Sequence, residues 1–212
     1  MIEVYLFSTP NSIRVPIALE ELGLHYEVIP VNVRKGEQKL AKFLAMNPNG
    51  KVPVLVDPDG PGDMAFTLTE SVAILIYLAE KTGLLIPLDL FERARVFEQM
   101  FFHVTGIGPA FGQVGFFKRQ APEQIPLAIS RFEAEAERTL RVLDGVLGRS
   151  KFVAGDNYSI ADITHFGWLW RREFAGVDFS ATPNVARWFD EVAARPAVVR
   201  AVELVTALVP PA

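Results

Sequence analysis

The 212-residue chain contains no cysteine, and this absence restricts its chemistry more than any other feature of its composition. Without cysteine it forms no disulfide, offers no thiolate ligand to a metal and has no nucleophilic sulfur of its own. Any sulfur chemistry would therefore need a thiol from a bound molecule. The sequence also lacks a Gly-x-Ser-x-Gly turn and a phosphate-binding Gly-Lys-Ser/Thr loop, so it does not support a serine hydrolase or a nucleotide-dependent enzyme.

Histidine is scarce, and neither sign of charge dominates. The three histidines, His25, His103 and His165, are far apart in the sequence, so we expect no metal site. The formal net charge is -4, with acidic and basic residues interspersed. This pattern gives no electrostatic footprint for a nucleic acid or an anionic membrane surface, and we expect neither partner.

Long hydrophobic segments are also missing. The segment from Phe101 to Phe117 contains no Asp, Glu, Lys or Arg and is too short and too glycine-rich for a membrane-spanning helix. Its alternating aromatic residues and glycines predict a kinked helix and loop beside an apolar pocket, with core packing against the N-terminal half as the alternative. The N-terminus does not resemble a signal peptide, so we expect a cytoplasmic location.

The first third of the chain alternates strands and helices. Apolar periodicity predicts a strand over 2–7, then a helix that begins no earlier than Asn11 or Ser12 and ends at Gly23. A strand over 26–33, a short helix over 38–48, a hairpin from 52–57 and 65–69, and a helix over 70–83 follow. This β-α-β-α-β-β-α order is the thioredoxin-like arrangement.

The remainder reads as helical. One helix is expected to begin at Pro122 and end at Gly148, and Ser159 with Asp162 forms a capping-box pattern that should start another. Two more helices are expected within 182–196 and 197–208. The sequence therefore predicts an α/β thioredoxin-like domain over 1–82, a linker over 83–90 and an all-α domain over 91–212.

Four motifs in this order carry a family resemblance: "STPNSIRVPIALEELG", "KVPVLV", "LTESVAILIYL" and "NYSIADI". Together with the two-domain pattern, they resemble the cytosolic glutathione transferases over essentially the whole chain. The "TPN", "KGEQ" and "GIGPAFGQ" segments are most similar to the Nu class, which is associated with glutathione-dependent disulfide reduction. The resemblance implies glutathione as cosubstrate, no metal and a homodimer.

The residues that would serve the glutathione sulfur lie at the start of the first helix. A free thiol titrates near ~8.5 and only the thiolate is nucleophilic, so the site must favour the anion. Thr9 and Asn11 can stabilise it together with the helix N-terminus. Ser12 is a competing hydroxyl, Tyr5 is expected to pack within its strand, and simple helix capping is the alternative role for Thr9 and Asn11.

Other residues are candidates for binding the rest of glutathione. The resemblance implies a cis peptide bond before Pro53, which would turn the Val52 backbone toward the ligand as a strand-like partner. At the start of a helix, Ser71 can donate to a ligand carboxylate while Glu70 accepts from its ammonium group. Candidate donors to the ligand's carboxylates are Gln38, Lys51 and Arg131.

Two functions remain open from the sequence. The first is a glutathione-dependent enzyme whose bound thiolate reduces small disulfides, conjugates electrophiles, or both. The second is a non-catalytic dimeric binding or scaffold protein that retains the transferase fold, because a fold does not establish a function.

Overall fold

The computed structural model describes residues 1–209, and its internal contacts divide them into two compact units. The first unit comprises residues 1–84 together with 195–209, and the second comprises residues 85–194. The last helix therefore groups with the first unit by its contacts, although the sequence pattern places it in the all-α domain. The domain boundaries at 82 and 91 stay a prediction.

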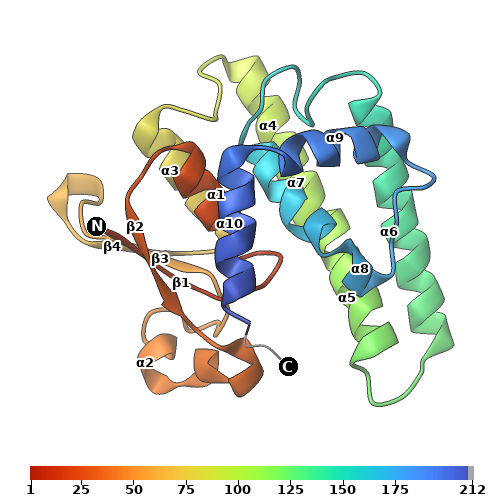
Figure 1. The fold of residues 1–212 in the computed structure, drawn as a ribbon, viewed down its shortest axis with the longest axis horizontal. Helices are drawn as coiled ribbons and strands as arrows, with labels where there is room; N and C mark the ends of the chain where they lie inside the picture. Colours follow the sequence, from red (N-terminus) through yellow and green to blue (C-terminus); the bar gives the residue numbers. More distant parts are fainter. Residues whose placement is uncertain (210–212) are drawn as a thin grey trace. The chain divides into compact units, whose positions relative to one another are not determined.

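The first unit contains a four-stranded mixed sheet with the strand order β2-β1-β3-β4. The strands are β1 (Ile2–Leu6), β2 (Tyr26–Pro30), β3 (Val54–Asp57) and β4 (Phe66–Thr69). β2 runs parallel to β1, whereas β3 runs antiparallel to both β1 and β4. A parallel crossover pair followed by an antiparallel hairpin confirms the expected thioredoxin-like arrangement (Figure 1).

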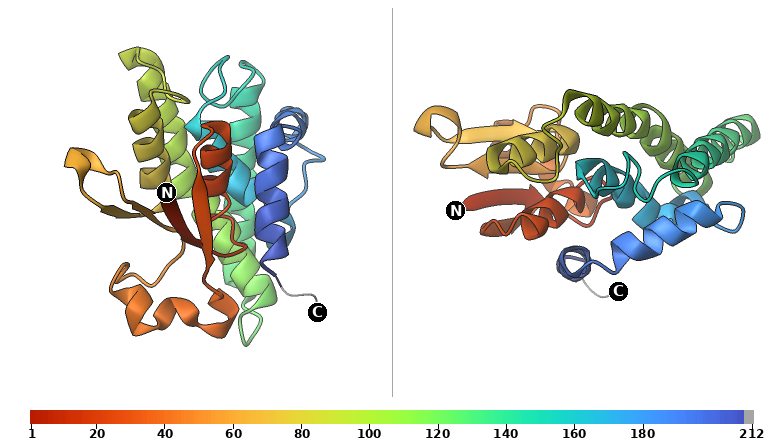
Figure 2. Two further views of the ribbon diagram at one scale, coloured as in Figure 1. Left: turned by 60° about the vertical axis from the view of Figure 1, so that its left-hand side comes forward. Right: turned by 90° about the horizontal axis from the view of Figure 1, so that it is seen from above.

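The helices of this unit are α1 (Arg14–Glu21), α2 (Ala41–Leu44), α3 (Ser71–Thr82) and α10 (Pro196–Ala207). α1 begins just after the earliest start expected from the sequence, and Pro16 lies in its first turn, where a proline removes no intrahelical hydrogen bond. α1 and α10 lie side by side (Figure 2) and are joined by a two-pronged Arg195–Glu21 ion pair, with distances of 2.6 and 2.9 Å.

The strand register places three separate segments at one end of the sheet. Tyr5 pairs with Val54, and Val54 pairs with Thr69. Because β3 is antiparallel to its neighbours, the end of β1, the start of β3 and the end of β4 lie at the same edge. The turn before α1, the segment before β3 and the start of α3 therefore emerge together.

The second unit is built from α4 (Leu90–Phe102), α5 (Gly108–Arg119), α6 (Pro126–Leu147), α7 (Ile160–Trp170), α8 (Arg172–Ala175) and α9 (Pro183–Ala193). α6 begins at Pro126, so the expected start at Pro122 is wrong by one turn. The reason is local: a residue that precedes proline avoids helical angles, and Ile125 accordingly has φ -116° and ψ 88°.

The segment 101–117 is helical throughout, so the expected loop is absent from it. α4 passes through a π-helical turn, His103–Ile107, directly into α5. The glycines on α5 allow aromatic rings of the same unit to approach closely. A Cβ atom on Gly108 would lie 3.2 Å from Trp168, and one on Gly115 would lie 2.2 Å from Phe174. Close packing within the helical unit explains these two glycines.

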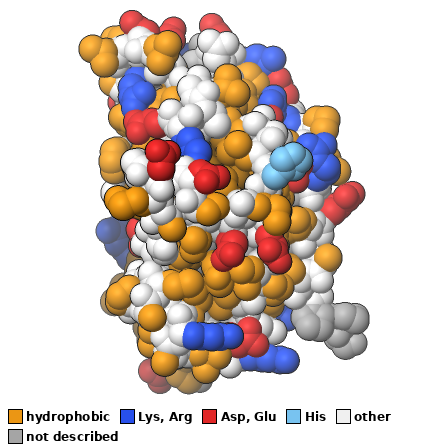
Figure 3. Space-filling model, turned by 90° about the vertical axis from the view of Figure 1, so that its left-hand side faces the viewer, with side chains coloured by type: hydrophobic (Ala, Val, Ile, Leu, Met, Phe, Trp, Pro, Cys, Tyr) orange, Lys and Arg blue, Asp and Glu red, His pale blue; other side chains and the backbone are white. Residues whose placement is uncertain are grey.

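No helix within residues 1–209 is both long and apolar enough to cross a membrane. Figure 3 shows acidic and basic side chains distributed among hydrophobic ones on the face that it draws. This distribution matches the interspersed charge of the sequence.

Candidate functional site

The turn between β1 and α1 is organised by Thr9. The Thr9 Oγ1 atom accepts a hydrogen bond from the Ser12 backbone N–H at 3.1 Å and donates to Ser12 Oγ at 2.8 Å. Its carbonyl oxygen also accepts from the N–H of Ile13 at 3.2 Å. Thr9 therefore caps the turn that leads into α1, and in this arrangement its hydroxyl proton is already used.

The three candidate groups around the expected sulfur position differ in availability. Ser12 is fully buried, with 0% of its surface exposed; its Oγ atom accepts from Thr9, which leaves its own hydroxyl proton outside this contact but shielded from solvent. Asn11 is half-buried, and its side chain makes no hydrogen bond to any residue within 1–209. Tyr5 donates to Glu3 Oε2 at 2.9 Å within its own strand, as expected. Asn11 is thus the candidate that is both partly exposed and without a side-chain hydrogen bond to the described residues.

The segment before β3 contains a cis peptide bond between Val52 and Pro53, as the resemblance implied. Across the described chain, the Val52 backbone N–H and C=O groups have no hydrogen-bond partner, so an extended ligand can pair with them. Lys51 is exposed beside this segment.

Asn47 supports this turn, and the sequence reasoning missed it. Its side chain is 4% exposed, donates to the Lys51 carbonyl at 2.7 Å and accepts from the Asn49 N–H at 3.0 Å. In the sequence, Asn47-Pro48 falls at the end of the short helix expected over 38–48. A short amide side chain that bonds to its neighbours' backbone is also typical of an organised turn, and that was the available signal.

The start of α3 has two unusual features. Glu70 precedes the helix with φ 67° and ψ 109°, a conformation that costs a non-glycine residue about 1–3 kcal/mol. No side chain caps this end, so the first backbone N–H groups of α3 are not satisfied by a cap within the described residues. The exposed Glu70 carboxylate and these donors together can bind a ligand that carries both charges.

Arg14 contacts this end of α3, and the sequence reasoning did not select it. Its guanidinium is 2% exposed, and Nη1 donates to Ser71 Oγ at 3.0 Å. Burial lowers the pKa of Arg14 to about 9, because the charged form loses hydration. The signal in the sequence was an arginine within the apolar run "SIRVPIAL" at the start of a helix.

Gln38 lies in a short 3₁₀ turn, Glu37–Lys39, and only one end of its amide is used. Nε2 lies 3.5 Å from the Val33 carbonyl oxygen, a long hydrogen bond. The Oε1 atom is buried and has no partner among the residues described. A buried acceptor without a partner costs about 1–3 kcal/mol, so a donor on a ligand that reached it would gain this amount.

The first unit brings most of the candidate residues to the end of the sheet defined by the strand register. The candidate residues in the segments that emerge at this end are Thr9, Asn11, Ser12, Gln38, Lys51, Val52, Pro53, Glu70 and Ser71. Arg131 belongs to the second unit, where it is exposed on α6. Its expected role toward the ligand stays a prediction.

Two features of the second unit invite separate consideration as sites. His103 and His165 are both buried, with their Nδ1 atoms 3.3 Å apart, although they are 62 positions apart in the sequence. Within residues 1–209, however, no group of three or more His, Asp or Glu side chains is placed to hold a metal ion. The two rings therefore form a polar pair in the core of this unit.

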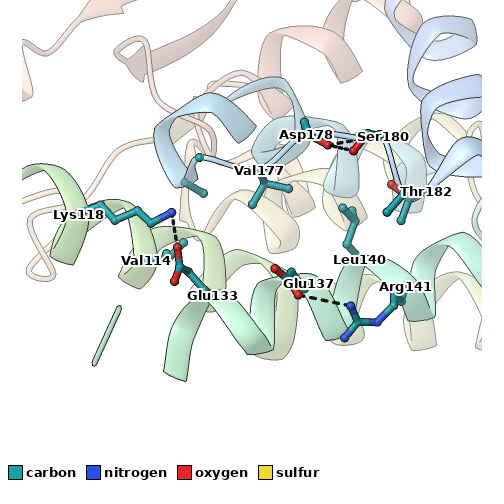
Figure 4. Close-up of a pocket in the computed structure, with 13 residues that line it drawn as sticks. Val114, Lys118, Glu133, Glu137, Leu140, Arg141, Val177, Asp178, Ser180 and Thr182 are labelled. Carbon is teal, nitrogen blue, oxygen red and sulfur yellow. Dashed lines mark hydrogen bonds and ion pairs between the residues drawn. The ribbon is translucent and has the colours of Figure 1, made fainter. Parts of the chain in front are cut away.

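The second feature is a hollow of about 340 Å³ between α5, α6 and the segment after α8 (Figure 4). Lys118 pairs with Glu133 at 2.5 Å, and Arg141 pairs with Glu137 at 3.4 Å. Because these charges already satisfy one another, they offer little to a charged ligand. The open groups of the first unit are the better candidates for a binding site.

The comparisons with known proteins identify the family of the chain. The model of the glutathione S-transferase N-terminal domain matches residues 9–81, and that of the C-terminal domain matches residues 117–196. The chain is 40% identical over 200 residues to the disulfide-bond oxidoreductase YfcG of Escherichia coli, an alignment that covers 93% of this chain and 92% of that protein.

Solved structures show the same relationship. A glutathione transferase from Burkholderia graminis, with two glutathione molecules bound per subunit, is 40% identical, with a TM-score of 0.90 over 95% of this chain and 87% of that one. A glutathione transferase from Pseudomonas putida, with one glutathione disulfide bound per subunit, is 36% identical, with a TM-score of 0.89 over 96% of this chain and 91% of that one. The chain belongs to the glutathione S-transferase family.

Proposed function

We propose that this protein is a glutathione-dependent enzyme in which the thiolate of bound glutathione reduces small disulfides. The observation that carries the proposal is the uncommitted Asn11 amide in the turn before α1, in a chain that has no cysteine of its own. A site that stabilises a thiolate but supplies no sulfur needs an external thiol. The E. coli relative is a disulfide-bond oxidoreductase, and the P. putida neighbour contains a glutathione disulfide, which supports this assignment.

The site residues act on glutathione in two places. At the sulfur, the Asn11 amide donates to the thiolate, and the backbone N–H groups at the start of α1 add the favourable potential of a helix N-terminus. A donor to the charged sulfur contributes about 1.5–3 kcal/mol, which corresponds to a thiol pKa lowered by roughly one to two units. Thr9 holds the turn in place, and Ser12 supports Thr9 from a buried position.

The peptide part of glutathione is held by the other open groups. The unpaired Val52 backbone pairs with the extended tripeptide, while Glu70 accepts from its ammonium group and Ser71 donates to the adjacent carboxylate. Lys51, Arg131 and the second N–H of the Gln38 amide are the proposed donors to its carboxylates. No proposed role requires a metal ion.

The reaction proceeds by two thiol–disulfide exchanges. The bound thiolate attacks one sulfur of the substrate disulfide, a glutathione mixed disulfide forms, and the other half leaves as a thiolate that takes up a proton. A second glutathione thiolate then attacks the mixed disulfide. The products are glutathione disulfide and the second substrate thiol, so two glutathione molecules are oxidised for each disulfide reduced.

The decisive measurement compares two activities of the purified protein. We expect glutathione-dependent reduction of a small dialkyl disulfide, followed as glutathione disulfide produced, to exceed conjugation of an aryl halide. Fast conjugation with undetectable disulfide reduction would overturn the proposal in favour of a conjugating transferase. Failure to bind immobilised glutathione would favour a scaffold protein, a function that the relatives do not support.

The role of Asn11 has its own test. In the Asn11→Ala variant, the pKa of the bound glutathione thiol should rise by about one to two units, because one hydrogen bond to the charged sulfur is lost. The ultraviolet absorbance of the thiolate as a function of pH measures this shift. Asn157→Ala, which removes an exposed asparagine in the second unit, is the matched control. An unchanged titration in Asn11→Ala would remove Asn11 from the mechanism.

We also propose that the protein is a homodimer. Large apolar side chains at the start of α4 are strongly exposed in the single chain, with Leu88 85%, Leu90 81% and Phe91 70% exposed. Isolated exposed apolar residues are ordinary, whereas a group of them indicates a partner surface. Light scattering should give twice the mass of one chain, and Leu90→Glu together with Phe91→Glu should shift it toward the monomer.

A further inference from the structure

The guanidinium of Arg14 contacts Ser71, the first residue of α3 and one of the residues proposed above to bind glutathione. It is 2% exposed, and its Nη1 atom donates to Ser71 Oγ at 3.0 Å. Building on the proposed function, we propose that Arg14 is a positioning residue: it directs the Ser71 hydroxyl proton toward the carboxylate of the γ-glutamyl group of glutathione and gives the site its preference for that carboxylate.

The direction of the hydrogen bond carries the first step. A guanidinium has only N–H donors, so Ser71 Oγ must be the acceptor in this contact. A serine hydroxyl has a single proton, and Arg14 cannot accept it. Ser71 is the first residue of α3, so the carbonyl four residues earlier belongs to β4 rather than to the helix. The proton is therefore left for an acceptor outside this pair.

The local potential carries the second step. The first backbone N–H groups of α3 are uncapped, and they favour the same kind of acceptor as the Ser71 proton. Arg14 adds a full positive charge in a place from which water is excluded, where its interaction with a nearby anion is weakly screened. Burial lowers the pKa of Arg14 only to about 9, so the group stays charged at neutral pH.

The chemistry of the ligand carries the third step. Glu70, next to Ser71, presents an exposed carboxylate that attracts a cation, whereas the start of α3 attracts an anion. An ammonium and a carboxylate on one carbon satisfy both. Glutathione carries such a pair only on its γ-glutamyl group. The carboxylate that Arg14 and Ser71 act on is therefore that of the amino-acid head of the ligand.

The test compares two ligands in four proteins. The ligands are glutathione and γ-aminobutyryl-cysteinyl-glycine, which lacks the γ-glutamyl α-carboxylate, and the dissociation constant of each is measured by calorimetry. We expect the wild-type protein to prefer glutathione by at least about tenfold, because a charge-assisted hydrogen bond is lost with the analogue. Arg14→Met and Ser71→Ala should each remove most of this preference. Arg14→Lys, which also only donates, should retain it.

The ratio of the two dissociation constants separates positioning from a merely structural role. Loss of packing would weaken both ligands equally and leave the ratio unchanged, and that result in Arg14→Met would overturn the proposal. Arg200→Met is the matched control, because it removes a charge from the same unit at an exposed position on α10. It should leave both constants unchanged.

Two further outcomes are informative. Should Arg14→Met fail to fold, Arg14→Gln tests the same point, because the glutamine oxygen can accept the Ser71 proton and should reduce the ratio. A wild-type protein that bound neither ligand would refute the proposed function itself. A wild-type protein that bound glutathione and the analogue equally well would leave that function standing and refute the role of Arg14.

Discussion

The starts of α3 and α7 both carry a serine and an acidic residue, but side chains cap the first backbone N–H groups of α7 and not those of α3. At α7, Ser159 accepts from the backbone N–H of Ala161, and Asp162 accepts from the backbone N–H of Ser159 at 2.9 Å, so the capping box expected from the sequence is confirmed. Asp162 also accepts from Trp188 Nε1 at 2.8 Å and is completely buried. At α3, no side chain caps the helix, and Glu70 is exposed with a φ of 67°.

The contrast is between a helix start that stabilises its own unit and one that we propose is kept for a ligand. The α7 start satisfies its donors with residues of its own unit and joins α7 to α9 through Trp188. The α3 start leaves its donors open and holds Glu70 in a conformation that disfavours folding. Such a local cost is typical of a functional site, and it supports the proposal that this helix end binds the glutamyl head of glutathione.

The largest expected effect is on stability and comes from the capped start of α7. Asp162→Ala removes the acceptor of four buried donors: the N–H groups of Val153 and Ser159, the Ser159 hydroxyl and the indole of Trp188. We expect the free energy of unfolding to fall by about 3–5 kcal/mol, measured by urea denaturation, because buried donors are left unsatisfied. Asp190→Ala, at an exposed position on α9, is the control and should change it by less than about 0.5 kcal/mol. Equal effects in the two variants would contradict the comparison.

Asp162, at the capped start of α7, should also make the stability of the protein depend on pH. Burial raises the pKa of Asp162 to about 6, against the hydrogen bonds from Val153, Trp188 and Ser159, which lower it. Since the folded pKa lies above the unfolded value near 3.9, the folded protein binds this proton more tightly. The contribution of Asp162 to stability is therefore greatest below about pH 4 and falls as the pH rises to about 6. Asp57, Glu135 and Asp178 have lowered pKa values and give the opposite trend, so the contribution of Asp162 is measured against a variant that lacks its titration.

The Asp162→Asn variant isolates this titration, because it keeps the shape of the side chain and removes its proton equilibrium. The wild-type-minus-variant difference in stability should decline between about pH 4 and about pH 6 and stay level above that. A difference that was constant with pH would show that Asp162 is not titrating in this range.

The smallest expected effect on stability is at the uncapped start of α3. Here a substitution should raise the stability, whereas Asp162→Ala lowers it. Glu70→Gly relieves the positive φ, whereas Glu70→Ala removes the same carboxylate and keeps the strain. We expect the glycine variant to be more stable than the alanine variant by about 1 kcal/mol. Both should bind glutathione more weakly than the wild type. Equal stability of the two variants, or undiminished binding, would argue against a strained residue kept for its ligand.

The sequence predicted the parts that rest on local rules. Alternating apolar residues located β1, the capping-box spacing located the start of α7, and the motif order indicated the family. Pro126 shows where a local rule was misapplied, because Pro122 also suits a first turn and only the angles of Ile125 distinguish the two starts. Spacing along the chain is enough when an element is stabilised by its own neighbours.

Only the tertiary structure decided which side chains meet. Arg14 and Ser71 are 57 positions apart, and His103 and His165 are 62 apart, so no local pattern could pair them. The same holds for availability, since Thr9, Asn11 and Ser12 are equivalent polar candidates until burial and hydrogen bonds separate them. The sequence by itself determined that sulfur chemistry here needs a borrowed thiol, because it contains no cysteine. Packing between distant segments decides which side chains, such as the Asn11 amide and the Ser71 hydroxyl, stay available for a ligand. Residue spacing along the chain does not encode that packing.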